Sequence, residues 1–135
     1  MTTTQRADGG ILTSEALRLY HFTCDDHGSK RIDQSRIIVP GSHLGIPVPQ
    51  SKFAWFTDLD APPREALGLA PVRATCDRLA RRYSAWSEDR EGRTVIYPWM
   101  LVRRTLPASF VDLLESTPGA MPRHWFVSAE AVRVA

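Results

Sequence analysis

Leu19-Tyr20-His21-Phe22-Thr23 is the stretch of sequence that decides the fold. Apolar and polar side chains alternate along it, a pattern that is typical of a half-buried strand. Successive side chains of a strand point to opposite faces of the sheet, so His21 and Thr23 share one face and Tyr20 and Phe22 share the other. We therefore expect a strand here, with a histidine and a threonine on one face.

Phe53-Ala54-Trp55-Phe56-Thr57-Asp58 is a second strand-like run, rich in aromatic side chains. Between the two runs, Ile37-Ile38-Val39-Pro40-Gly41-Ser42 joins a short apolar stretch to a Pro-Gly turn. Residues 32–39 carry apolar side chains at mixed spacing, which leaves open either a short helix or a helix followed by a strand. The polar stretch 24–30 is expected to be a loop.

The rest of the chain holds more strand-like than helix-like segments. Residues 77–86 predict a helix, because their apolar side chains fall on one stripe. Residues 109–115 predict a shorter helix with Ser109 as its cap, and residues 58–67 show the pattern of a helix start. The remaining strand-like segments are residues 72–76, 94–102, 124–128 and 131–134. Because strands outnumber helices and do not alternate with them regularly, we expect an α+β fold.

The length of 135 residues is that of one domain. Residues 1–10 are expected to be a disordered leader, so that a single domain covers residues 11–135. The hydrophobic fraction of 43% and the charged fraction of 24% are ordinary for a globular protein. The net charge of +2 is small and the basic residues are interspersed with acidic ones, so charge alone does not indicate a nucleic-acid-binding protein.

Two features of the sequence bear on its compartment. No apolar run reaches about 18 residues, so we expect no membrane span and no membrane partner. The first ten residues lack the apolar core of a signal peptide. Cys24 and Cys76 are therefore expected to be reduced thiols. The sequence predicts a cytoplasmic protein.

The two strand-like runs, with the Pro-Gly turn between them, resemble the opening of an ADP-ribosyltransferase-like domain. The resemblance covers residues 18–60 best and looks closest to small bacterial and phage relatives of DNA-targeting toxin transferases and of RNA 2′-phosphotransferases. It implies a fold of two small packed, mostly antiparallel sheets with short peripheral helices. It also implies a toxin-like transferase that binds NAD and transfers ADP-ribose to a macromolecular acceptor, either a protein or a nucleic acid.

The resemblance also implies a set of site residues. His21 would hydrogen-bond the ribose and take part in catalysis, and a late glutamate, Glu130, would stabilise the ribosyl oxocarbenium ion of the transition state. The positions that match the cofactor site of the family are His21, Thr23, Trp55, Phe56 and Thr57.

Two departures from the family pattern support an alternative. The tyrosine of the family's second motif is absent, with Trp55 and Phe56 in its place, and Glu130 follows the last strong strand instead of opening it. The alternative is a non-catalytic binding module of the same fold, such as a phage or bacterial accessory protein.

Other chemistries are less well supported by the spacing of the residues. His21, Cys24 and His27 are zinc-type ligands, but they lack the paired spacing of zinc knuckles, so we expect no metal. Cys24 and His27 also make a weak candidate for nucleophile and base, because no third group is indicated that would orient them.

Three arginines fall on one turn of the helix expected at residues 77–86, namely Arg78, Arg81 and Arg82. A guanidinium pairs bidentately with phosphate, so the resemblance implies that one or two of them meet the pyrophosphate of NAD. A solvated helix face is the alternative.

Overall fold

The computed structural model describes residues 4–5, 10–12, 18–24, 27–41, 53–69, 78–86 and 95–135. The strands are β1 (Thr4–Gln5), β2 (Ile11–Leu12), β3 (Leu19–Thr23), β4 (Ile37–Ile38), β5 (Ala54–Thr57), β6 (Arg81–Trp86), β7 (Tyr97–Pro98), β8 (Trp125–Ser128) and β9 (Val132–Val134). The α-helices are α1 (His27–Ser35), α2 (Trp99–Val102) and α3 (Ala108–Glu115). Three short 3₁₀ helices are η3 (Arg64–Leu67), η4 (Arg103–Thr105) and η5 (Pro122–His124).

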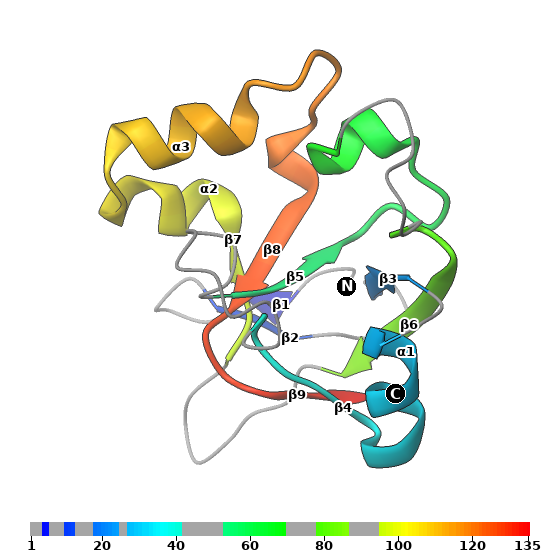
Figure 1. Ribbon diagram of the computed structural model, residues 1–135. Coiled ribbons are helices and arrows are strands. Elements are labelled where there is room, and N and C mark those ends of the chain that lie inside the picture. The colour runs from blue at the N-terminus through cyan, green and yellow to red at the C-terminus, as the bar shows by residue number, and fades with distance from the viewer. Residues whose placement is uncertain are drawn as a thin grey trace.

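Seven strands form one antiparallel sheet in the order β4-β9-β6-β3-β5-β8-β7, and β1 pairs separately with β2. Figure 1 shows α2 and α3 together on one side of this sheet and α1 on the other. The domain is therefore an α+β fold with an antiparallel sheet and short helices. Its strands make one seven-stranded sheet and one small pair, whereas the resemblance implied two small packed sheets.

The face of the sheet that α1 covers, here called the α1 face, is mainly aliphatic. Tyr83 fixes the helix to it, because the tyrosine hydroxyl donates to Asp33 Oδ1 (2.8 Å) and lies 3.2 Å from the main-chain oxygen of Ser29. The buried residues of this cluster are Leu19, Ile32, Ile38, Ala54, Phe56, Tyr83, Ala85, Val95, Ile96, Phe126 and Val132.

The opposite face, here called the tryptophan face, packs against α2 and α3 through large rings. The Trp99 ring centroid lies 5.2 Å from that of Trp55 and 6.0 Å from that of Trp125. The carboxylate of Glu115 joins the two helices, since it accepts from Trp99 Nε1 (2.6 Å) and from Arg103 Nε (2.8 Å). The buried residues of this cluster are Trp99, Val111, Leu114, Trp125 and Val127.

Several predicted elements are confirmed. β3 and β5 lie within the two runs that decide the fold, and β8 and β9 account for the last two predicted strands. α3 is the predicted second helix. For residues 32–39 the structure has the helix-then-strand alternative, because α1 ends at Ser35 and β4 begins at Ile37.

The helix predicted at residues 77–86 is wrong, because Arg81–Trp86 is strand β6. Within it, buried Tyr83 and Ala85 alternate with more exposed neighbours. The sequence of this segment is therefore compatible with the two-residue period of a strand as well as with the apolar stripe of a helix. All five residues of β3 pair with β6, so tertiary pairing decided between the two patterns.

Smaller predictions also need correction. The expected loop at residues 24–30 gives way to α1, which begins at His27. Pro107, and not Ser109, precedes α3, without a capping side-chain hydrogen bond. Cys24 is disulfide-bonded, contrary to the expected reduced thiol. β1 lies inside the expected disordered leader, and the predicted strand 72–76 lies outside the described residues.

In the described parts of the chain, no helix is long and apolar enough to cross a membrane.

Candidate functional site: a pocket on the tryptophan face

A cavity of about 440 Å³ opens where β3 and β5 meet the segment that follows η3. This volume lies in the range of pockets that enclose a small organic ligand. The wall that the two strands supply consists of Tyr20, His21, Phe22, Trp55, Phe56 and Thr57. The cavity therefore lies beside the stretch of sequence that decides the fold.

The pairing of β3 with β5 explains why the sheet leaves room here. The two strands pair at a single position, Tyr20 with Thr57, whereas β3 pairs with β6 along its whole length. Beyond that position the main-chain oxygen of Trp55 bonds to the imidazole of His21, with Nδ1 at 2.8 Å. Because a carbonyl oxygen can only accept, Nδ1 carries the hydrogen of this bond. The His21 ring is thus held in place, 5.7 Å from the ring of Phe56.

Thr57 places a buried hydroxyl group in the strand wall. The residue is 1% exposed, and its Oγ1 accepts a hydrogen bond from the main-chain N–H of Leu59 at 3.2 Å. A hydroxyl that accepts one hydrogen bond can still donate its own hydrogen. Thr57 therefore offers a hydrogen-bond donor in a wall made mostly of rings.

A second wall consists of Leu67, Gly68, Leu69, Leu113, Leu114 and Trp125. It meets the strand wall at Trp125, which pairs with Thr57. Gly68 shapes this wall, because its φ of +75° is one that residues with a side chain rarely adopt. A Cβ atom at Gly68 would also lie 3.1 Å from the main-chain oxygen of Leu114 and from the ring of Trp125. The wall therefore depends on a glycine where two segments meet closely.

Two hydrogen bonds fix this second wall to the rest of the domain. Trp125 Nε1 donates to the main-chain oxygen of Ala66 at 2.7 Å, and Thr117 Oγ1 donates to that of Gly68 at 3.1 Å. Both join residues far apart in the sequence. The result is an apolar surface that two long-range hydrogen bonds hold beside the strand wall.

Arg78 is the one charged residue among those described that line the cavity, and the lining includes no Asp or Glu. A second guanidinium, that of Arg82, lies 4.7 Å from the ring centroid of the lining residue Tyr20. It donates to the main-chain oxygen of Asp60 at 2.8 Å. A cation over an aromatic face is attracted by the ring quadrupole. The described part of the lining is therefore positively charged, which favours a ligand with a negative charge.

The structure brings four of the predicted site residues together, since His21, Trp55, Phe56 and Thr57 all line the cavity. Thr23 does not line it; it ends β3, opposite Arg81 in β6.

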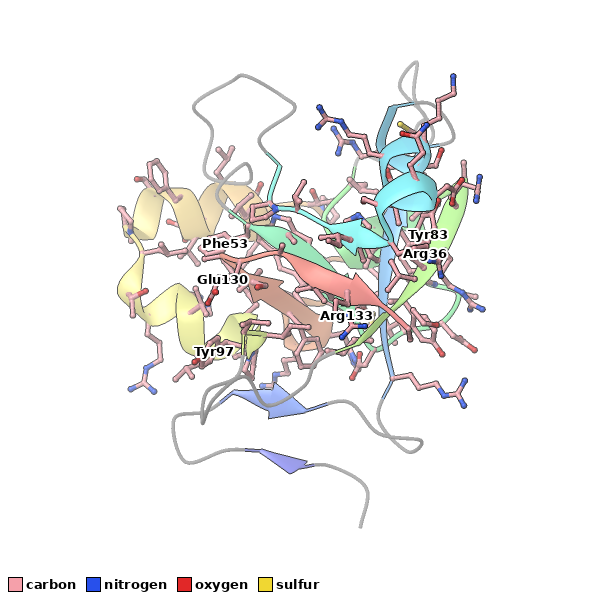
Figure 2. The ribbon with its side chains drawn as sticks, turned by 90° about the horizontal axis from the view of Figure 1, so that it is seen from below. Arg36, Phe53, Tyr83, Tyr97, Glu130 and Arg133 are labelled. Atoms are coloured by element: carbon pink, nitrogen blue, oxygen red, sulfur yellow. The ribbon has the colours of Figure 1, made fainter. Side chains whose placement is uncertain are left out.

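Glu130 also lies outside the cavity lining. It follows the end of β8 at which Ser128 pairs with Ala54, whereas the cavity adjoins the end at which Trp125 pairs with Thr57. Three residues of strand separate these ends by about 10 Å. Figure 2 accordingly shows Glu130 beside Phe53, at the start of β5.

Asp58 brings a carboxylate close to the strand wall, although it is not part of the lining. It follows Thr57 directly, and its Oδ1 lies 2.7 Å from His124 Nδ1, which donates to it. Both side chains are about one-third exposed. Asp58 therefore joins the ends of β5 and β8 and does not cap a helix, since Pro63 precedes η3.

Sequence reasoning missed most of the second wall. Leu113 and Leu114 were recognisable as part of a helix, but no local pattern connects them with Gly68. Trp125 lies in a predicted strand, and at 4% exposed it fills the core while also lining the cavity. The signal for a special backbone position was the Leu-Gly-Leu sequence at residues 67–69, which follows a predicted helix start.

Within the described residues, no group of three or more His, Cys, Asp or Glu side chains is arranged to hold a metal ion. Comparisons of the chain with protein families, with curated proteins and with solved structures find no match.

Proposed function

We propose that this protein binds NAD in the pocket of the tryptophan face and has an ADP-ribosyltransferase-like fold and activity toward a macromolecular acceptor. One observation carries the proposal. His21, Trp55, Phe56 and Thr57, which the resemblance assigns to the cofactor site, lie together in the wall of one cavity.

The chemistry of the lining suits one half of a dinucleotide. Aromatic side chains offer faces for a planar heterocycle, and His21 and Thr57 supply polar groups for ribose hydroxyls. Arg78 supplies a guanidinium for a phosphate group, which is the pairing expected for one of the three arginines singled out in the sequence.

Calorimetry with NAD tests the binding proposal through a matched pair of variants. His21→Ala changes a residue that lines the cavity and removes the imidazole that bonds to the Trp55 oxygen, whereas Thr23→Ala changes a residue of the same strand outside the lining. We expect His21→Ala to weaken NAD binding about tenfold, the effect of losing roughly one hydrogen bond and a ring contact. Thr23→Ala should leave it unchanged. Equal NAD affinity in the His21→Ala and wild-type proteins would contradict the proposal.

A second candidate function is supported by the absence of a carboxylate from the described lining residues. Cleavage of the nicotinamide–ribose bond develops positive charge, which a transferase must stabilise. A pocket in which the one charged residue of the described lining is an arginine is better suited to binding NAD than to cleaving it. The alternative is therefore a binding module that keeps NAD intact.

Release of nicotinamide separates the two functions. Release in proportion to protein concentration would exclude the binding-only function. If release occurs, the variants Glu130→Gln and Asp58→Asn identify the carboxylate involved. Given the position of Glu130, we expect its variant to keep the wild-type rate. A collapse of turnover at unchanged NAD affinity would instead make Glu130 catalytic.

A further inference from the structure

The disulfide bond of Cys24 connects two segments of the pocket lining that are far apart in the sequence. Cys24 directly follows β3 and is disulfide-bonded. The sequence holds one other cysteine, Cys76, which is therefore its partner. Residues 20–22 of β3 line the pocket, and Cys76 comes two positions before Arg78, the one charged residue of the described lining. The bond therefore joins the segment that supplies part of the strand wall to the segment that supplies the charge.

Arg78 lies between two attachments to the same end of β3. After it in the sequence, Arg81 begins β6 and pairs with Thr23, the last residue of β3. Before it, Cys76 is bonded to Cys24, the residue that follows Thr23. Because two or three residues of chain span at most about 7 to 10 Å, the two attachments together restrict where Arg78 can lie.

These attachments matter because the side chain of Arg78 has little else to fix it. Arg78 is exposed, and with the described residues its side chain makes no hydrogen bond or ion pair. Arg82 differs, since it donates to the main-chain oxygen of Asp60 and stacks on the ring of Tyr20. A segment held at one end loses more conformational entropy when a ligand orders it than a segment held at both ends. The readiness of Arg78 to bind a ligand therefore depends on the disulfide.

A small thiol can reduce this bond, because Cys24 is partly exposed. Exposed disulfides are generally the labile or regulatory ones. A thiolate of the reductant attacks one sulfur atom, the S–S bond breaks, and the released cysteine thiolate takes up a proton. A second thiol then displaces the other cysteine, so that two thiols are oxidised to one disulfide and the protein gains two cysteine thiols.

We propose that the disulfide of Cys24 and Cys76 is a redox switch for the pocket. In the oxidised protein the bond holds Arg78 in the lining, where its guanidinium pairs with a negatively charged ligand. In the reduced protein Arg78 keeps its attachment through Arg81 alone, while the hydrogen bonds of the second wall are unaffected. The inference rests on the proposed function in one respect, that the ligand of Arg78 is a phosphate group of NAD.

Limited digestion with trypsin tests the switch without reference to NAD. The disulfide form is compared with protein reduced by dithiothreitol, and a thiol assay confirms two free thiols after reduction. Trypsin cleaves after arginine, and we expect reduction to speed cleavage after Arg78 about tenfold, because the segment then opens more readily. Cleavage after the exposed residues Arg104 and Arg123 is the control and should keep its rate. An unchanged rate at Arg78 would overturn the switch. Equal acceleration at all three positions would also overturn it, because the bond would then stabilise the whole domain.

Calorimetry with NAD measures the consequence for binding. We expect reduction to weaken NAD binding about tenfold, the effect of losing one charge-assisted hydrogen bond. The double variant Cys24→Ser and Cys76→Ser should bind NAD as weakly as the reduced protein does, with or without dithiothreitol. Arg78→Gln should bind with the same low affinity in both redox states, because it lacks the side chain that the switch controls. Equal affinity of the oxidised and reduced wild type, or an undiminished effect of reduction in Arg78→Gln, would overturn the proposal.

The two measurements keep this inference apart from the proposed function. If NAD binds neither redox state while reduction still speeds cleavage after Arg78, the proposed function fails and the switch stands, with another anion as its ligand. If NAD binds both states equally and cleavage after Arg78 does not change, the proposed function stands and the switch is overturned.

Discussion

The two faces of the sheet are built differently. The α1 face is covered by one helix and filled mainly by aliphatic side chains, with Tyr83 and Asp33 tying the helix in place. The tryptophan face packs three indole rings against α2 and α3 and leaves a cavity of about 440 Å³ beside them. Both faces bury one side of the same strands, yet the pocket opens mainly at the tryptophan face, with Phe56 of the α1-face cluster also in its lining.

Packing geometry accounts for this difference. Small aliphatic side chains interdigitate in many arrangements and close the space under a helix. Three large rings at centroid distances between 5.2 and 6.0 Å form a rigid block, so the segments around it meet only at particular points such as Gly68. The face with the more rigid packing is therefore the one that keeps an open site.

The largest effect should come from removing one ring of the ring block, which consists of Trp55, Trp99 and Trp125. Trp99 is fully buried, contacts two other indoles and donates to Glu115. Trp99→Ala should lower the free energy of unfolding by about 4 kcal/mol, because it opens a cavity and leaves a half-buried carboxylate with fewer partners. Urea denaturation measures the change. A loss of less than about 1 kcal/mol would show that the rings are not a rigid block.

A substitution at Gly68 tests the contact between the second wall and Trp125 of the ring block. Gly68→Ala should cost about 2 kcal/mol, from a left-handed φ and from a Cβ atom 3.1 Å from the Trp125 ring. The same substitution should weaken NAD binding, since Gly68 lines the pocket. Gly119, with a φ of +88° but outside the lining, is the control. Gly119→Ala should lower stability in urea denaturation without changing NAD affinity.

On the α1 face, Tyr83→Phe should cost about 1 kcal/mol, the net value of its hydroxyl hydrogen bond. Burial raises the pKa of Tyr83 above its usual value of 10.0, so the folded protein holds the proton more tightly than the unfolded chain does. The stability that Tyr83 contributes is therefore present below pH 10 and is lost as the pH rises through the folded-state pKa. Denaturation at several pH values should show a smaller alkaline decline in Tyr83→Phe than in the wild type.

Leu113 should give the smallest change in stability and the clearest separation of stability from binding. It lines the pocket but is 61% exposed, so Leu113→Ala should change the free energy of unfolding by less than about 0.5 kcal/mol. The same variant should bind NAD several-fold more weakly. Unchanged binding would place the ligand against the strand wall alone.

The strand wall of the pocket was largely predictable from the sequence. Alternation identifies β3 and β5, and four of the five residues predicted to bind the cofactor line the cavity. This worked because neighbours within a strand have fixed positions relative to one another. The prediction for the β6 segment was wrong for a related reason. Its pattern fits both the helical period and the strand period, and only its pairing with β3 decides between them.

The second wall and the contacts between β6 and α1 could not be predicted in this way. Gly68 meets Leu114 and Trp125 only after the chain has folded back on itself, and the arginines of β6 meet α1 through Asp33 and Tyr83. Each contact joins residues more than 40 positions apart. Local patterns carry no information about such partners.

The strand order has a consequence for how the chain folds as it is made. β9 lies between β4 and β6 in the sheet but follows both of them in the sequence. Until it arrives, β4 has no neighbour in the seven-stranded sheet, although α1 and β4 were synthesised about 95 residues earlier. Pairings at such sequence distances are slow to form. Sheet completion should therefore be a late event in folding, and the edges of β4 and β6 should stay exposed until β9 pairs with them.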